Sequence, residues 1–146
     1  MRLNIDFYVH WLWAATFGLL ALSGFALMGA RYGWIMNYDL TVADYLHRTM
    51  AALYVVLLAV SILIEILRIL VNLKVSRFMM VGIGSHQVFT LLSTLLLIIS
   101  GLFIWVCMEF SVVSLAFCLV IHEIAAFLAL GSIIWHIYQK NHVLTI

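Results

Sequence analysis

The chain has 146 residues, of which 67% are hydrophobic and 9% are charged, and its mean hydropathy is +1.22. Seven Lys and Arg side chains against six Asp and Glu give a formal charge of +1, so the chain lacks the basic surface that nucleic-acid binding requires. The composition excludes an ordinary water-soluble protein, and the length predicts one domain over residues 1–146.

Four apolar stretches are long enough to cross about 30 Å of hydrocarbon as helices. They cover roughly residues 7–29, 43–67, 85–107 and 112–138. None has the alternating pattern of an outer-membrane strand, and the short connections make successive helices antiparallel. We therefore predict an all-α integral membrane protein, an antiparallel bundle of four transmembrane helices. No internal repeat is visible in the sequence.

The distribution of basic residues predicts the direction of the spans. One side of the predicted bundle carries both termini and most of the basic side chains, namely Arg2, Arg68, Lys74, Arg77 and Lys140. The other side carries Arg31 and Arg48 together with several carboxylates. Because loops rich in Lys and Arg stay in the cytoplasm, both termini are predicted to be cytoplasmic.

Histidines are the residues that best indicate a function in this apolar chain. An ionisable group inside a membrane span costs free energy and usually has a functional role. His122 and His136 lie 14 residues apart in the last span, which is about 21 Å along one helix face. On the predicted topology His10 is level with His136, and His47 is level with His122. Neutral imidazole is a common axial ligand of haem iron, so two histidine pairs at two depths predict two b-type haems in the bundle core.

Neighbouring residues suit such haems. Arg48 beside His47 is placed to neutralise a propionate of the outer haem, and Lys140 or Arg77 is placed to do so for the inner one. Gly18 and Gly131 leave clearance for the porphyrin faces. No CxxCH motif is present, so the haems are expected to bind noncovalently. The alternative for each histidine alone is a hydrogen bond within the bundle or a place among the headgroups.

The histidine pattern resembles a known family. His10 opening the first helix, the HR pair at 47 and 48 opening the second, and His122 with His136 in the fourth are similar to the di-haem cytochrome b subunits of respiratory formate dehydrogenases, nickel-iron hydrogenases and related molybdoenzymes. The resemblance implies that His47 and His122 bind the outer haem, while His10 and His136 bind the inner one.

The same resemblance implies a redox role in a prokaryotic cytoplasmic membrane. An extracytoplasmic dehydrogenase, hydrogenase or molybdoenzyme subunit would pass electrons through an iron-sulfur subunit to the outer haem. The inner haem would then reduce a quinone, either menaquinone or ubiquinone, near the cytoplasmic side. Such inward electron transfer separates charge across the membrane.

The quinone site of this family carries polar residues before its third helix, often as Asn-x-Gly-Gln. Here the segment reads GIGSHQ, in which Gln87 matches while Gly84 and His86 replace Asn and Gly. His86 is expected to bind a quinone carbonyl or relay a proton, with an interfacial role or inner-haem ligation as alternatives. Glu65 is expected to pair with Arg68 one turn away, with a proton path as its alternative.

The leading interpretation is an electron-transfer subunit that also provides the quinone site, rather than a complete enzyme. A stand-alone di-haem cytochrome b acting on quinol is the first alternative, and ligation by a histidine of the third helix would favour it. A metal or proton carrier and a non-redox membrane anchor are further alternatives, although no mid-span carboxylates or broken helices indicate transport.

Overall fold

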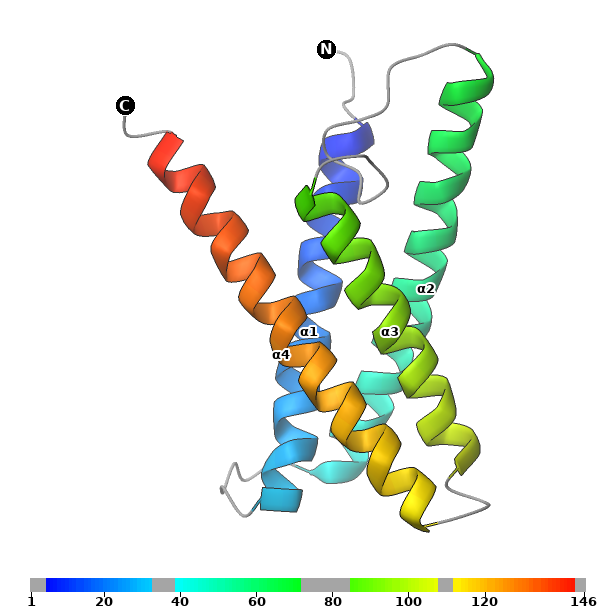
Figure 1. Cartoon of the computed structure of the whole chain (residues 1–146), viewed down its shortest axis with the longest axis vertical. Helices are drawn as coiled ribbons and strands as arrows, with labels where there is room; N and C mark the ends of the chain where they lie inside the picture. The colour runs from blue at the N-terminus through cyan, green and yellow to red at the C-terminus, as the bar shows by residue number, and fades with distance from the viewer. Residues whose placement is uncertain (1–4, 33–38, 72–84, 108–111, 144–146) are drawn as a thin grey trace. The chain divides into compact units, whose positions relative to one another are not determined.

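The computed structural model describes residues 5–32, 39–71, 85–107 and 112–143. These ranges form four helices, α1 (Ile5–Tyr32), α2 (Leu40–Leu70), α3 (Ser85–Cys107) and α4 (Val112–Val143), and contain no strand (Figure 1). All four are long and apolar enough to cross a membrane. The predicted all-α fold with four transmembrane helices is therefore confirmed.

Three of the helices are longer than the apolar stretches that predicted them. The helix α2 begins at Leu40 because Asp39 caps it, its Oδ1 accepting from the backbone N–H of Thr41 at 2.9 Å. Nearer the end of the chain, α4 continues to Val143 through a polar segment. Hydropathy detects only the part of a helix that suits lipid, so these polar ends lay outside the predicted spans.

Exposed apolar side chains give the helices their membrane character. The best 18-residue window of each helix has a mean hydropathy between 1.7 and 2.6. Large apolar side chains are exposed on all four helices, among them Leu22, Leu63, Phe103 and Ile134. In water such surfaces would associate, whereas a bilayer solvates them, so the fold is that of a multi-pass membrane protein.

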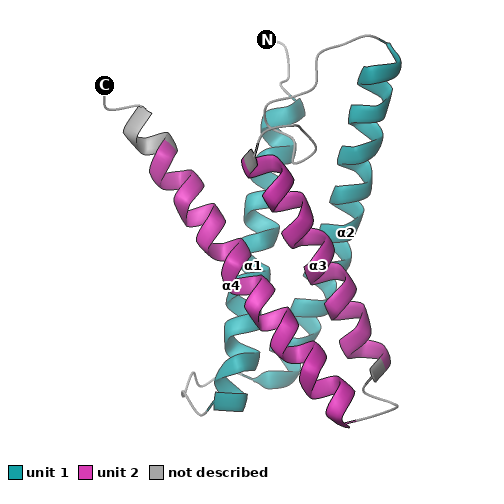
Figure 2. Cartoon of the chain, in the orientation of Figure 1, with its two compact units in different colours: residues 1–82 teal, residues 83–146 magenta. Residues whose placement is uncertain are grey.

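The chain divides into two compact units, Met1–Gly82 and Ile83–Ile146 (Figure 2). In the first unit α1 packs on α2, and in the second α3 packs on α4. Early residues of one helix contact late residues of its neighbour, as Asp6 does with Arg68, so the first unit is an antiparallel hairpin. The contact of His86 with Ser132 gives the second unit the same form. The single domain over residues 1–146 stays a prediction.

A tryptophan of α1 joins the two helices of the first hairpin. The indole Nε1–H of Trp13 donates a hydrogen bond of 3.1 Å to Ser61 Oγ, and both residues are buried. The Trp13 ring also meets Tyr54 edge to face, with 4.2 Å between ring centroids. A buried indole needs a partner for its N–H, which explains a serine at this apolar helix contact.

An ionic cluster joins α1 to α2 at the end of the hairpin away from their connection. Arg68 donates from Nη1 to Glu65 Oε1 at 2.9 Å and from Nη2 to Asp6 Oδ1. The expected pairing of Glu65 with Arg68 is thus confirmed, and Asp6 joins it. Only 1% of Glu65 is exposed, so its charge depends on the guanidinium for compensation. Its role in a proton path stays a prediction.

Replacing Arg68 by methionine is expected to lower the free energy of unfolding by about 3 kcal/mol, because it leaves a buried carboxylate without its cation. Asp44→Asn is the matched control, since it breaks the Arg48–Asp44 pair, which is about half exposed on both sides. That change is expected to cost about 0.5 kcal/mol or less. Denaturant titration in detergent micelles measures both, and equal losses would contradict a structural role for the Arg68 cluster.

Candidate functional site

His47 is held against α1 by a serine. Its ring is half-buried, and its Nδ1 lies 3.0 Å from the Oγ of Ser23, which is buried. The same hydroxyl lies 2.7 Å from the carbonyl oxygen of Leu19, one turn earlier in α1. The imidazole therefore has a fixed orientation on the inner face of the first hairpin.

His122 is held in the same way in the second hairpin. Its Nδ1 lies 2.8 Å from the Oγ of Ser100 in α3, and that hydroxyl lies 2.7 Å from the carbonyl oxygen of Leu96. His47 and His122 each lie in the first half of the second helix of a hairpin. Both are therefore nearer to the connected end of their hairpin than to its open end.

A glycine follows each of the two serines and lets the helices approach. A Cβ at Gly24 would lie 3.3 Å from Cε1 of His47, and a Cβ at Gly101 would lie 3.4 Å from Cε1 of His122. A Cβ at Gly24 would require a shift of a few tenths of an ångström from the imidazole, and a Cβ at Gly101 would be at the limit of ordinary van der Waals contact. The Ser–Gly pair thus provides both the hydrogen bond and the space for the ring.

At the open end of the second hairpin two histidines stack. The rings of His86 and His136 lie parallel within 3°, with 4.5 Å between centroids, and Ser132 Oγ lies 3.3 Å from Nδ1 of His86. Axial haem ligands approach iron from opposite sides of the porphyrin, so two stacked rings are not placed as one axial pair. His86 as a substitute for another inner-haem ligand stays a prediction.

The histidines are sorted between the two ends of each hairpin. In the first hairpin, His10 lies in the second turn of α1, at the open end, and His47 lies toward the connected end. In the second, His136 lies toward the open end and His122 toward the connected end. This order within each hairpin is the one that the predicted depths require. The ligand pairs that join the two hairpins stay predictions.

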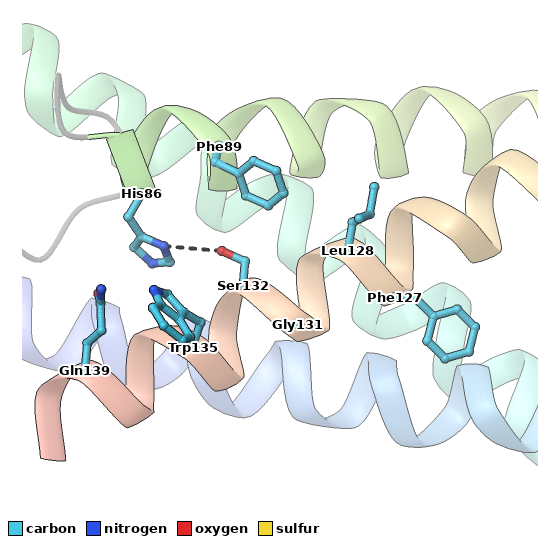
Figure 3. A pocket seen from close by; sticks show the side chains of 8 residues that line it. All are labelled: His86, Phe89, Phe127, Leu128, Gly131, Ser132, Trp135 and Gln139. Atoms are coloured by element: carbon cyan, nitrogen blue, oxygen red, sulfur yellow. Dashed lines mark hydrogen bonds between the residues drawn. The ribbon is translucent and has the colours of Figure 1, made fainter. Parts of the chain in front are cut away.

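A groove of about 520 Å³ lies along α3 and α4 beside the stacked histidines (Figure 3). One end is polar, with His86, Ser132 and Gln139. Trp135 also lies at this end, and the remainder is lined by Phe89, Phe127, Leu128 and Gly131. A groove that is polar at one end and apolar along the rest suits a ligand with a polar head and a hydrocarbon tail.

The other predicted site residues take separate places. Arg48 is exposed and donates from Nε to Asp44 at 3.0 Å, so a propionate there would share it with a carboxylate. Gln87 is half-buried beside His86 in the first turn of α3 and is not among the residues that line the groove. Arg77 and the side chain of Lys140 lie outside the described residues.

The comparisons with known proteins identify no family. No protein-family model matches the chain, and neither does any curated protein or solved structure. The resemblance to di-haem cytochrome b subunits therefore stays a prediction from the residues themselves.

Several residues that contact the candidate site histidines were not predicted from the sequence. A Ser–Gly pair at 23–24 precedes His47, and another at 100–101 precedes His122 by a similar interval. These two Ser–Gly pairs could have been noticed in the sequence. Four matching residues in two helical hairpins are, however, too few to be recognised as a repeat. Gln139 gave no sequence signal, because only the packing of α4 against α3 brings it and Ser132 to His86.

Proposed function

We propose that this chain is the membrane cytochrome b subunit of a respiratory oxidoreductase complex. It would carry two b-type haems, each ligated by two histidines, and pass electrons to menaquinone or ubiquinone. His47 and His122 would hold the outer haem, and His10 and His136 the inner one. Haem supplies the one-electron redox chemistry, and the protein supplies ligands, orientation and an apolar surrounding.

The observation that carries this proposal is the matched environment of His47 and His122. Each imidazole lies within an apolar helix, with Nδ1 against a serine of the facing helix and its ring against a glycine. Haem-ligating histidines need this type of support on the nitrogen that does not bind the metal. The donor set therefore fits iron in a porphyrin.

The groove supports the quinone part of the proposal. A quinone head has two carbonyl acceptors, and donors are available at the polar end from His86, Ser132 and Gln139. The aromatic and aliphatic remainder suits an isoprenoid tail. Gln139 would then take the amide role that the sequence assigned to Gln87.

The described residues form four apolar helices, and a respiratory complex also needs a part that oxidises its substrate, so the proposal includes partners. An iron-sulfur subunit would deliver electrons from a dehydrogenase, hydrogenase or molybdoenzyme subunit. The excess of Lys and Arg on the side of the bundle that carries the termini supports both termini inside. The prokaryotic cytoplasmic membrane is proposed from the family resemblance.

A stand-alone di-haem cytochrome b acting on quinol is the second candidate function. His86 lies in the first turn of α3 and stacks on His136, which keeps a helix-three histidine near a proposed ligand. The described residues contain no cluster of three His, Cys, Asp or Glu able to hold a metal ion, and a carrier or a non-redox anchor stays a further alternative. Purification of the native protein with or without partner subunits separates the two cytochrome functions.

The direct test is the haem content and the reduced-minus-oxidised visible spectrum of the purified chain. We expect two b-type haems per chain with low-spin spectra, because both axial positions are filled by imidazole. Haem extraction into acidified organic solvent checks that attachment is noncovalent. A chain that contains no haem after expression with excess haem supply would overturn the proposal in favour of an anchor or carrier.

A further inference from the structure

The hydroxyl hydrogen of Ser23 is directed at carbonyl oxygens of its own helix. Its Oγ lies 2.7 Å from the carbonyl oxygen of Leu19 and 3.1 Å from that of Leu20, and a carbonyl oxygen only accepts hydrogen bonds. The hydroxyl must therefore donate there, and a hydroxyl has a single hydrogen. Toward His47 Nδ1, at 3.0 Å, the serine oxygen can then only accept. The hydrogen of that contact belongs to the imidazole.

The same count applies to Ser100. Its hydroxyl hydrogen is directed at the carbonyl oxygens of Leu96 at 2.7 Å and Leu97 at 3.2 Å, so its oxygen accepts from Nδ1 of His122 at 2.8 Å. Both serines are buried, where a hydroxyl cannot exchange these partners for bulk water. Each serine thus makes the facing histidine a donor at Nδ1.

We propose that Ser23 and Ser100 are positioning residues that fix His47 and His122 as the tautomer protonated at Nδ1. In a neutral imidazole of this form the lone pair is on Nε2, which is the nitrogen that can bind a metal. The serines therefore choose the ligating atom before any metal is bound. The assignment of the tautomer depends on the hydrogen bonds alone, whereas the ligation of iron by Nε2 rests on the proposed function.

The hydrogen bond from the histidine Nδ1–H to the serine is also expected to change the midpoint potential of a bound haem. An Nδ1–H that donates a hydrogen bond gives its imidazole more anionic character, which makes Nε2 a stronger donor to iron. A stronger donor stabilises ferric over ferrous iron and lowers the midpoint potential. Because both hairpins carry the same Ser–Gly and His arrangement, the two ligands would be tuned alike.

The first test reads the tautomer without haem. The full chain is labelled with ¹⁵N-histidine, prepared in detergent from haem-limited cells, and its ring nitrogen signals are assigned by their loss in His47→Ala and His122→Ala. We expect Nδ1 to be protonated and Nε2 to carry the lone pair in both residues. Ser23→Ala and Ser100→Ala should give tautomer mixtures at the facing histidine only, and the threonine variants should restore the single form.

Ser93→Ala is the matched control, because Ser93 makes the same back-bond within α3, to the carbonyl oxygen of Phe89 at 2.7 Å. It should leave both histidine signals unchanged. Protonation at Nε2 in the wild-type chain would overturn the proposal, and so would alanine variants with unchanged tautomers.

The second test uses the haem-loaded chain. Ser100→Ala and Ser23→Ala are expected to raise the midpoint potential of the outer haem and to weaken its binding by about 10-fold to 100-fold, while Ser93→Ala changes neither. Unchanged potentials would overturn the tuning role. If the chain binds no haem but shows the expected tautomers, the proposed function fails and the assignment of Ser23 and Ser100 stands.

Discussion

Replacing His47 or His122 by alanine is expected to halve the haem content of the purified chain. Each variant removes one axial ligand of the proposed outer haem, and the inner haem keeps both of its own. The loss of affinity should exceed about 100-fold, which is the upper end of the cost of removing a mere supporting partner of a metal ligand. Haem extraction and the reduced spectrum measure the result.

The structure gives this prediction its physical reason. An imidazole oriented by a serine on the facing helix loses little further freedom when it binds iron, so its removal takes away a prepared ligand rather than a mobile one. The haem that remains should be low-spin, since both of its histidines are intact. Added imidazole is expected to restore part of the missing haem by entering the space that the missing ring leaves in each variant.

The reciprocal variants complete the design. His10→Ala and His136→Ala should remove the inner haem and spare the outer one, so that the two classes of variant leave haems of different midpoint potential. His86→Ala should retain both haems. A loss of haem in His86→Ala with full retention in His10→Ala would contradict the proposed ligand pairs and assign the inner haem to α3 instead.

The helices were predictable because lipid imposes a simple rule on sequence. A backbone within hydrocarbon must satisfy its own hydrogen bonds, and four apolar stretches of sufficient length leave helices as the solution. The spans at 85–107 and 112–138 therefore start at the residues where α3 and α4 begin. The earlier start of α2 depends on the cap at Asp39, a local signal that hydropathy does not contain.

The candidate site was only partly predictable, and its residues show why. His47 and His122 stood out by their cost within a span, because an ionisable group in lipid is rare. Their partners Ser23 and Ser100 did not, because serine is common in transmembrane helices and forms back-bonds wherever it occurs. What distinguishes these two from Ser93 is the residue across the hairpin, and only helix packing determines that.

The groove at the open end of the second hairpin was also only partly predictable from the sequence. A family pattern directed attention to Gln87, which follows His86 in sequence and lies about 100° round the helix from it. The amide that lines the groove is Gln139, more than 50 residues away and close to His86 through the packing of α4 on α3 (Figure 3). Spacing along one helix could be calculated, whereas the register between two helices could not.

Filling this groove is expected to block the quinone reaction while leaving both haems in place. A Cβ built at Gly131 meets no heavy atom within 4 Å, so Gly131→Phe should fold and place its ring in the groove near Ser132 and Trp135. We expect the rate at which a short-chain quinol reduces the haems to fall by about 10-fold to 100-fold, as substrate access is lost. Dithionite should still reduce both haems completely.

Ile134→Phe is the matched control, because Ile134 is 59% exposed on the same helix and does not line the groove. It should leave the quinol rate unchanged. The sequence also assigned Gly131 to the clearance of a porphyrin, and the two roles give opposite results. Loss of a haem in Gly131→Phe would place the porphyrin at this glycine, whereas full haem content with a slow quinol reaction is the result that the groove predicts. An unchanged quinol rate would remove the groove from the proposed path and move the quinone to another face of the chain.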